Sequence, residues 1–117
     1  FSESGNSKKQ SQAWAFEKNN DYKSASEIYT QLINDNPENN SYYNNRAKCE
    51  IELSDYKSAI KDCEKALSIK PSGWIYYTYA YALYYDEKYK DACNAINKSI
   101  EMGYTKDNEG LCDPPEN

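Results

Sequence analysis

The stretch Asp21-Tyr22-Lys23-Ser24-Ala25 returns without change as Asp55-Tyr56-Lys57-Ser58-Ala59, which lies 34 residues further along the chain. A related stretch, Lys88-Tyr89-Lys90-Asp91-Ala92, follows after another 33 residues. A period between about 20 and 50 residues indicates an array of supersecondary units, because each unit has an apolar face that only a stacked neighbour can cover. The sequence therefore predicts a tandem array, and the long surfaces of such arrays favour a binding function.

Each unit contains two helical patterns that a short polar turn separates. In the second pattern, apolar residues recur at steps of three and four, which is the spacing of one helix face. Asp21 and Asp55 precede second helices, where a carboxylate can accept hydrogen bonds from free backbone N–H groups. Pro37 and Pro71 follow them, and proline ends a helix because it lacks the N–H donor. We expect first helices over 7–18, 41–53 and 74–85 and second helices over 22–35, 56–69 and 89–102.

Alanine recurs at matching places in the two helices of every unit. A small residue at a helix crossing lets the two axes approach closely, whereas a bulky side chain there forces them apart. We therefore expect these residues to lie buried at the crossings. They are Ala13, Ala47 and Ala80 in the first helices and Ala25, Ala59 and Ala92 in the second.

The period, the small residue midway along the first helix, the Tyr and Ala of the repeated stretch and the closing proline together resemble the tetratricopeptide repeat. Residues 42–49 and 62–67 are similar to the middle repeat of co-chaperones. The resemblance implies an all-α fold, a right-handed α-solenoid of three helix-turn-helix hairpins, and no chemistry of its own. The expected organisation is a disordered leader over 1–6, three units over 6–39, 40–72 and 73–104 within residues 7–102, and a C-terminal tail over 103–117.

The resemblance also implies a concave groove, lined by the first helices, that holds a partner peptide or helix. The groove is expected to carry amides in its middle and aromatic rings at one end. Asparagine can bond a peptide backbone through both donor and acceptor, and buried aromatic residues are enriched among interface hot spots. Packing at the end of the stack is the alternative role for the rings of the third unit. The candidate groove residues are Gln10, Trp14, Asn44, Asn45, Lys48, Trp74, Tyr77, Thr78 and Tyr81.

Some co-chaperones of this family clamp the acidic C-terminal tail of heat-shock chaperones with lysine, arginine and asparagine side chains. Asn45 matches one of these donors. Gln10 and Trp14 stand at the two places in the first unit. In the third unit the two places hold Trp74 and Thr78, or Ile75 and Tyr79 if the alignment allows no gap. Without the cations, a buried peptide carboxylate is poorly compensated. We therefore expect no tight binding of a chaperone tail and a less charged, more apolar ligand.

The composition argues against several other functions. A net charge of −5 and a pI of about 4.8 argue against nucleic acid as a partner, and no apolar run predicts membrane insertion. The chain has no histidine, and its four glycines form no phosphate-binding motif. The expectation is a protein that is not an enzyme and that uses no cofactor.

Four cysteines, at positions 49, 63, 93 and 112, have no spacing typical of a zinc site. Cys49, Cys63 and Cys93 are expected on packed helix faces as free thiols, which suggests a reducing compartment and a cytoplasmic location. A disulfide between Cys93 and Cys112 is the alternative, in an exported protein.

The second candidate function is assembly. No evident polar helix follows Met102, and an uncovered stack end favours self-association or docking to another domain. This hypothesis predicts a homodimer that forms through the C-terminal end of the array.

Overall fold

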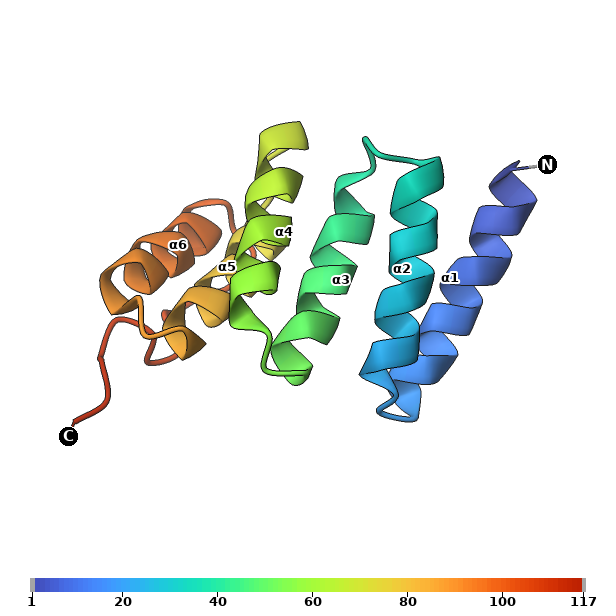
Figure 1. Ribbon diagram of the computed structural model, residues 1–117. Helices are drawn as coiled ribbons and strands as arrows, with labels where there is room; N and C mark the ends of the chain where they lie inside the picture. Colours follow the sequence, from blue (N-terminus) through green and yellow to red (C-terminus); the bar gives the residue numbers. More distant parts are fainter. Residues whose placement is uncertain (1, 117) are drawn as a thin grey trace.

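The computed structural model describes residues 2–116 as six α-helices joined by turns, with no strand in that range. Neighbouring helices stand side by side in one row from the N-terminal to the C-terminal end (Figure 1). The long axis of 49 Å against 27 and 21 Å reflects this stacking. The predicted all-α solenoid is therefore confirmed. The helices are α1 (Ser2–Lys18), α2 (Tyr22–Asp35), α3 (Asn40–Glu52), α4 (Tyr56–Ile69), α5 (Gly73–Tyr85) and α6 (Tyr89–Glu101).

The helix limits agree with the predicted ones to within one residue, except at the start of α1. That helix begins at Ser2, so the expectation of a disordered leader over 1–6 is wrong for residues 2–6, and residue 1 lies outside the described residues. This stretch contains no proline that would stop the helix. In addition, Asn6 Nδ2 donates to Asn36 Oδ1 at 3.3 Å, which ties the beginning of α1 to the end of α2.

The turn inside each unit repeats in atomic detail. Its closing backbone N–H donates to a carbonyl five residues earlier at 2.8 Å in all three units. The turn also places Asn20, Ser54 and Glu87 in the left-handed region, with φ of 62°, 62° and 65°. The predicted caps are confirmed, because Asp21 accepts from the Ser24 N–H and the equivalent aspartate in unit two does the same.

The core runs along the array between the packed helices, and all six helices contribute buried residues to it. All six alanines expected at helix crossings are fully buried, which confirms the predicted burial. Leu32, Ile75 and Ile96 are among the largest fully buried side chains of the core. The helices are therefore held at fixed spacing, and α3 and α5 come close enough to contact each other.

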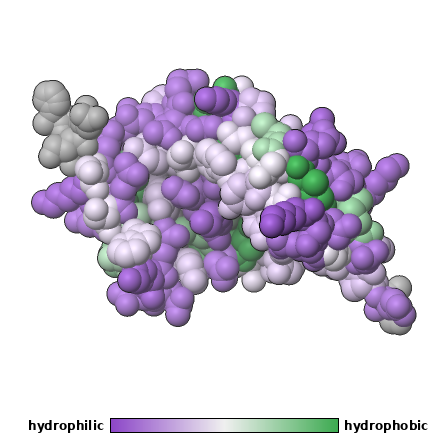
Figure 2. Space-filling view, turned by 180° about the vertical axis from the view of Figure 1, so that it is seen from behind, coloured by the Kyte–Doolittle hydropathy of each residue, from purple (hydrophilic) through white to green (hydrophobic). Residues whose placement is uncertain are grey.

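The surface of the array is mostly polar. Seen from behind, hydrophilic and weakly polar residues cover most of the face and strongly hydrophobic ones are few (Figure 2). Within residues 2–116, no helix combines the length and the apolar character that a membrane crossing requires.

Candidate functional site

A cavity of about 680 Å³ lies between α3 and α5 and reaches Tyr104, just after α6. The α3 side supplies amides, a cation and a carboxylate, whereas the α5 side supplies aromatic rings. This division follows from the sequence, since α5 carries a tyrosine or tryptophan at most of its positions. The lining residues are Asn44, Asn45, Lys48, Ile51, Glu52, Trp74, Tyr77, Thr78, Tyr81, Tyr85 and Tyr104.

Two of the nine candidate groove residues do not line this cavity, and seven do. The Gln10 amide is used in packing, because its Nε2 donates to the Tyr42 hydroxyl at 3.1 Å. Trp14 is 60% exposed and has the Lys18 ammonium 4.4 Å from its ring centroid. It lines a separate cavity of about 270 Å³, which shares Lys48 and Glu52 with the larger one. The first unit therefore contributes to a neighbouring surface and not to the main cavity.

Two polar residues of the lining are themselves buried. Asn44 is 5% exposed, and its Oδ1 has no hydrogen-bond partner among the described residues. A buried amide oxygen in this state is an acceptor that water or a ligand N–H could satisfy. Thr78 is satisfied within its own helix, because its hydroxyl donates to the Trp74 carbonyl at 3.2 Å. The lining therefore offers a free acceptor on α3, at Asn44, whereas the hydroxyl donor of Thr78 on α5 is already used.

The segment after α6 lies against the aromatic rings of α5. The Tyr77 hydroxyl donates to Glu109 Oε1 at 2.8 Å, and the Tyr81 hydroxyl donates to the same oxygen. These two bonds, led by that from Tyr81, lower the pKa of the Glu109 carboxyl. Further along, Tyr84 donates to the Asp113 carbonyl at 3.3 Å, and Leu111 is only 3% exposed. Sequence reasoning missed this segment because it has no helical period.

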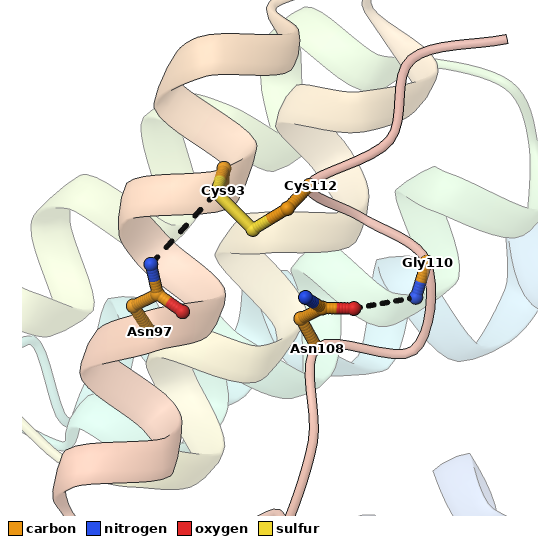
Figure 3. The surroundings of a disulfide bond; sticks show 5 residues. All are labelled: Cys93, Asn97, Asn108, Gly110 and Cys112. Carbon is orange, nitrogen blue, oxygen red and sulfur yellow. Dashed lines mark hydrogen bonds between the residues drawn. A yellow bond between two sulfur atoms is a disulfide. The ribbon is translucent and has the colours of Figure 1, made fainter.

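A disulfide joins Cys93 on α6 to Cys112 in this segment (Figure 3). The expectation of a free thiol at Cys93 is therefore wrong, whereas Cys49 and Cys63 are free and buried as predicted. The chain can return to α6 because Gly103 and Gly110 take left-handed backbone angles, with φ of 81° and 80°. The thiol argument for a reducing compartment no longer holds, and the compartment stays a prediction.

The same contacts cover the C-terminal end of the stack. In this array α5 packs on α3 and α4, so a following first helix would pack on α5 and α6. The segment after α6 contacts those two helices through the tyrosine bonds, the buried leucine and the disulfide. The expectation of an uncovered end is therefore wrong. It rested on the absence of a capping helix, which an irregular segment replaces here.

A charged cluster beneath the groove fixes the orientation of α3. Arg46 Nε and Nη2 donate to the two oxygens of Asp62 on α4, each at 2.7 Å, and Nη1 donates to the Thr30 hydroxyl on α2 at 3.1 Å. Glu50 lies 3.8 Å from Arg46 on the same helix. Its burial, together with the neighbouring Asp62 carboxylate, raises the pKa of Glu50. The cluster thus links α2, α3 and α4 through one guanidinium.

Glu50 makes the stability of the domain depend on pH. The pKa of Glu50 is higher in the folded state than in the unfolded chain, so this carboxyl contributes stability at pH values below its unfolded-state pKa. The contribution is lost as the pH rises through the folded-state pKa. The chain has no histidine, so few other groups titrate between about pH 5 and pH 9. We expect Glu50→Gln to exceed the natural chain in stability at pH 8 by about 1 kcal/mol, and to match it more closely at pH 5.

Urea unfolding at the two pH values checks this expectation. The matched control is Glu52→Gln, because Glu52 lies on the same helix and is exposed. If Glu50→Gln and Glu52→Gln show the same pH dependence, the Glu50 carboxyl is ionised in the folded domain at neutral pH.

The profile of the tetratricopeptide repeat matches residues 11–73. The small glutamine-rich tetratricopeptide repeat-containing protein 2 of Saccharomyces cerevisiae is 38% identical over 85 residues, which cover 72% of this chain and 25% of that protein. The Hsp70/Hsp90 co-chaperone CNS1 of the same yeast is 38% identical over 79 residues, covering 63% of this chain and 20% of that protein. The chain spans about a quarter or less of the length of these relatives.

A solved structure supports the same assignment. The Sgt2 tetratricopeptide repeat domain from Aspergillus fumigatus matches with a TM-score of 0.86 and 25% identity, over 93% of this chain and 75% of that one. The family profile covers more than half of the chain, and the six helices form three hairpins with the expected turns. The chain belongs to the tetratricopeptide repeat family.

Proposed function

We propose that this domain is a non-catalytic interaction module that takes a partner peptide or helix into the cavity between α3 and α5. The observation that carries the proposal is an open space of about 680 Å³ that is lined by both side-chain amides and aromatic rings. A space of this size is in the usual range of ligand sites. The similarity to a co-chaperone of Hsp70 and Hsp90 and to another tetratricopeptide repeat-containing protein supports the same conclusion.

The two walls of the cavity would contribute differently to binding. On α3, Asn45 and the unpartnered Oδ1 of Asn44 can bond the backbone of an extended segment. On α5, the half-buried rings of Trp74 and Tyr77 offer flat apolar area with few rotatable bonds to immobilise. A ligand that places an apolar side chain on α5 and its backbone along α3 would use both walls.

The charges of the cavity argue against a strongly acidic ligand. Among the described lining residues, Lys48 is the cation and Glu52 is the carboxylate, so their charges offset each other. The hydroxyls of Tyr77 and Tyr81 are already occupied by Glu109. Binding a peptide carboxylate here would remove its hydration, and the one lining cation, Lys48, is already offset by Glu52 among the described lining residues.

We therefore predict no tight binding of a peptide that ends in Glu-Glu-Val-Asp, the acidic chaperone tail. Titration calorimetry should give a Kd weaker than about 100 μM, since neutral donors alone hold a carboxylate poorly. The matched variant Gln10→Lys/Trp74→Lys adds cations at two places where co-chaperones of this family have them, and it should bind more tightly than the natural chain. A low-micromolar Kd for the natural chain would contradict the proposed ligand class.

A second prediction tests the cavity directly. Twelve-residue peptides selected from a displayed library on the natural domain should bind Trp74→Ala about tenfold more weakly, because Trp74 supplies the largest ring of the lining. Trp14→Ala is the matched control, since Trp14 lies outside the main cavity. A thermal melt of each variant confirms that the fold is kept. If the selected peptides bind Trp74→Ala and the natural domain equally, the cavity is not the binding site.

The remaining expectations belong to the same proposal. The net charge of −5 favours a protein partner over nucleic acid, and the lack of histidine supports a role without catalysis. A cytoplasmic location is proposed from the type of the relatives. The argument for a homodimer through the C-terminal end no longer holds, because the segment after α6 covers that end.

A further inference from the structure

We propose that the segment from Thr105 to Asp113 is a redox-controlled latch, which occupies the C-terminal end of the groove while the Cys93–Cys112 disulfide is intact and leaves it after reduction. The end that the latch occupies is the aromatic one, formed by α5. The inference concerns the regulation of the groove and so rests on the proposed function.

The latch contacts the groove at two lining residues. Tyr77 and Tyr81 both line the cavity, and both hydroxyls donate to one oxygen of Glu109. Glu109 Oε2 also lies 3.3 Å from the hydroxyl of Thr105, which belongs to the latch itself. The Glu109 carboxylate therefore occupies the donors that an acidic or polar group of a bound partner would need.

The donors that hold the carboxylate are neutral hydroxyls and no cation, so the bonds are of moderate strength. They persist because the carboxylate is tethered, which gives it an effective concentration that a separate molecule in dilute solution does not reach. The tether has its fixed point at Cys112, three residues beyond Glu109. Without that fixed point, the effective concentration of the carboxylate at the tyrosines falls.

Apart from these bonds, the disulfide and the bond from the Tyr84 hydroxyl to the Asp113 carbonyl, little else holds the latch in place. Leu111 is its buried residue, while Lys106, Asp107, Glu109 and Gly110 are exposed. Its internal hydrogen bonds join residues two to four apart, such as the Gly110 N–H to Asn108 Oδ1 at 2.9 Å (Figure 3). Such short-range bonds shape the turn but do not attach it to α5 or α6. Segments with few buried contacts open at low cost in free energy.

The turn at the end of α6 separates the latch from the rest of the fold. The Tyr104 N–H donates to the Ser99 carbonyl at 3.0 Å, and Gly103 takes the left-handed conformation that this helix end requires. Tyr104 is therefore held by α6 itself and stays as a wall of the cavity. Only the residues beyond Tyr104 are expected to leave the groove after reduction of the disulfide.

The chemical step is thiol–disulfide exchange with a dithiol reductant. One thiolate of the reductant attacks a sulfur of the Cys93–Cys112 bond, and its second thiol resolves the mixed disulfide. Two electrons pass to the protein, two protons complete the Cys93 and Cys112 thiols, and the reductant becomes a disulfide. Both cysteines are half-buried and not enclosed, so a reductant can reach them.

Tyrosine acetylation by N-acetylimidazole, followed by peptide mass spectrometry, tests the latch in the full chain. In Cys93→Ser/Cys112→Ser, we expect the acetylation rates of Tyr77 and Tyr81 to rise about tenfold, the effect of losing a hydrogen bond to a charged group. The rate of Tyr22, at the far end of the array, should stay unchanged. The natural chain should show the same rise after reduction with dithiothreitol and alkylation of its thiols.

A matched pair of variants tests the carboxylate contact while the disulfide is intact. Glu109→Gln should raise the acetylation rates of Tyr77 and Tyr81, whereas Glu116→Gln, in the same C-terminal segment, should not. Equal rates in the natural chain and the double serine variant would overturn the latch, as would a rise that includes Tyr22. No partner enters this experiment, so the latch can fail while the groove still binds its ligand, and the reverse also holds.

Discussion

Replacing Arg46 by methionine is expected to lower the free energy of unfolding by about 3 kcal/mol, because the buried Asp62 carboxylate then loses its cation inside the array. Arg46 holds Asp62 through two bonds of 2.7 Å, and Glu50 lies 3.8 Å away. The side chain of Asp62 is only 8% exposed, so water cannot replace the guanidinium. A loss of about 3 kcal/mol is at the low end of the range for breaking a buried ion pair. We expect this low value because the side chain of Arg46 itself is 22% exposed.

Urea unfolding at pH 7 measures the loss, and Lys57→Met provides the matched control. Lys57 also pairs with an aspartate, Asp86, at 3.2 Å, but its side chain is 80% exposed. Exposed pairs contribute about 0–1 kcal/mol, so the control should remain near the natural chain. If Arg46→Met and Lys57→Met lose the same stability, the cluster does not hold α3 in place.

Replacing Ala47 by leucine is expected to cost about 1–3 kcal/mol through overpacking of the crossing between α3 and α4. Ala47 has no exposed surface, and three added carbon atoms can enter only if the helices move apart. Because Asn44, Asn45 and Lys48 lie on the same helix, the movement should also change the width of the groove. The spacing of two helices and the shape of the binding surface should therefore change together.

Thermal or urea melts of Ala47→Leu, compared with Ala15→Leu, check this expectation. Ala15 is exposed on α1, so leucine there meets solvent and should have little effect on stability. A melt of Ala47→Leu that matches the Ala15→Leu control would mean that Ala47 does not lie at a tight crossing.

Most of the fold could be predicted from the sequence because each unit repeats the same physical constraints. The aspartate caps, the alanines at the crossings and the prolines after the second helices define where helices start, touch and stop. The exception is the start of α1, which has no equivalent unit before it. Its extra turns depend on a contact between Asn6 and Asn36, which no period predicts.

The groove was predictable only where the repeat determines it. Helical spacing assigns the inward face of α3 and α5, and the seven candidates from these helices do line one cavity. Spacing cannot say which pair of first helices leaves a space, because that depends on side-chain size, and Gln10 therefore lies outside the main cavity. The position of Glu109 depends on a disulfide and on two left-handed glycines, and neither leaves a periodic signal.

The irregular segment behind α5 and α6 also limits how the array can grow. A fourth hairpin added at this end would need the same surfaces of α5 and α6 that Leu111 and Cys112 now use. Protein engineers who wish to lengthen the solenoid in this direction would first have to cut the covalent link and remove the segment. Extension from the α1 end meets no such obstacle among the described residues, so the two ends of this array are not equivalent as sites of fusion.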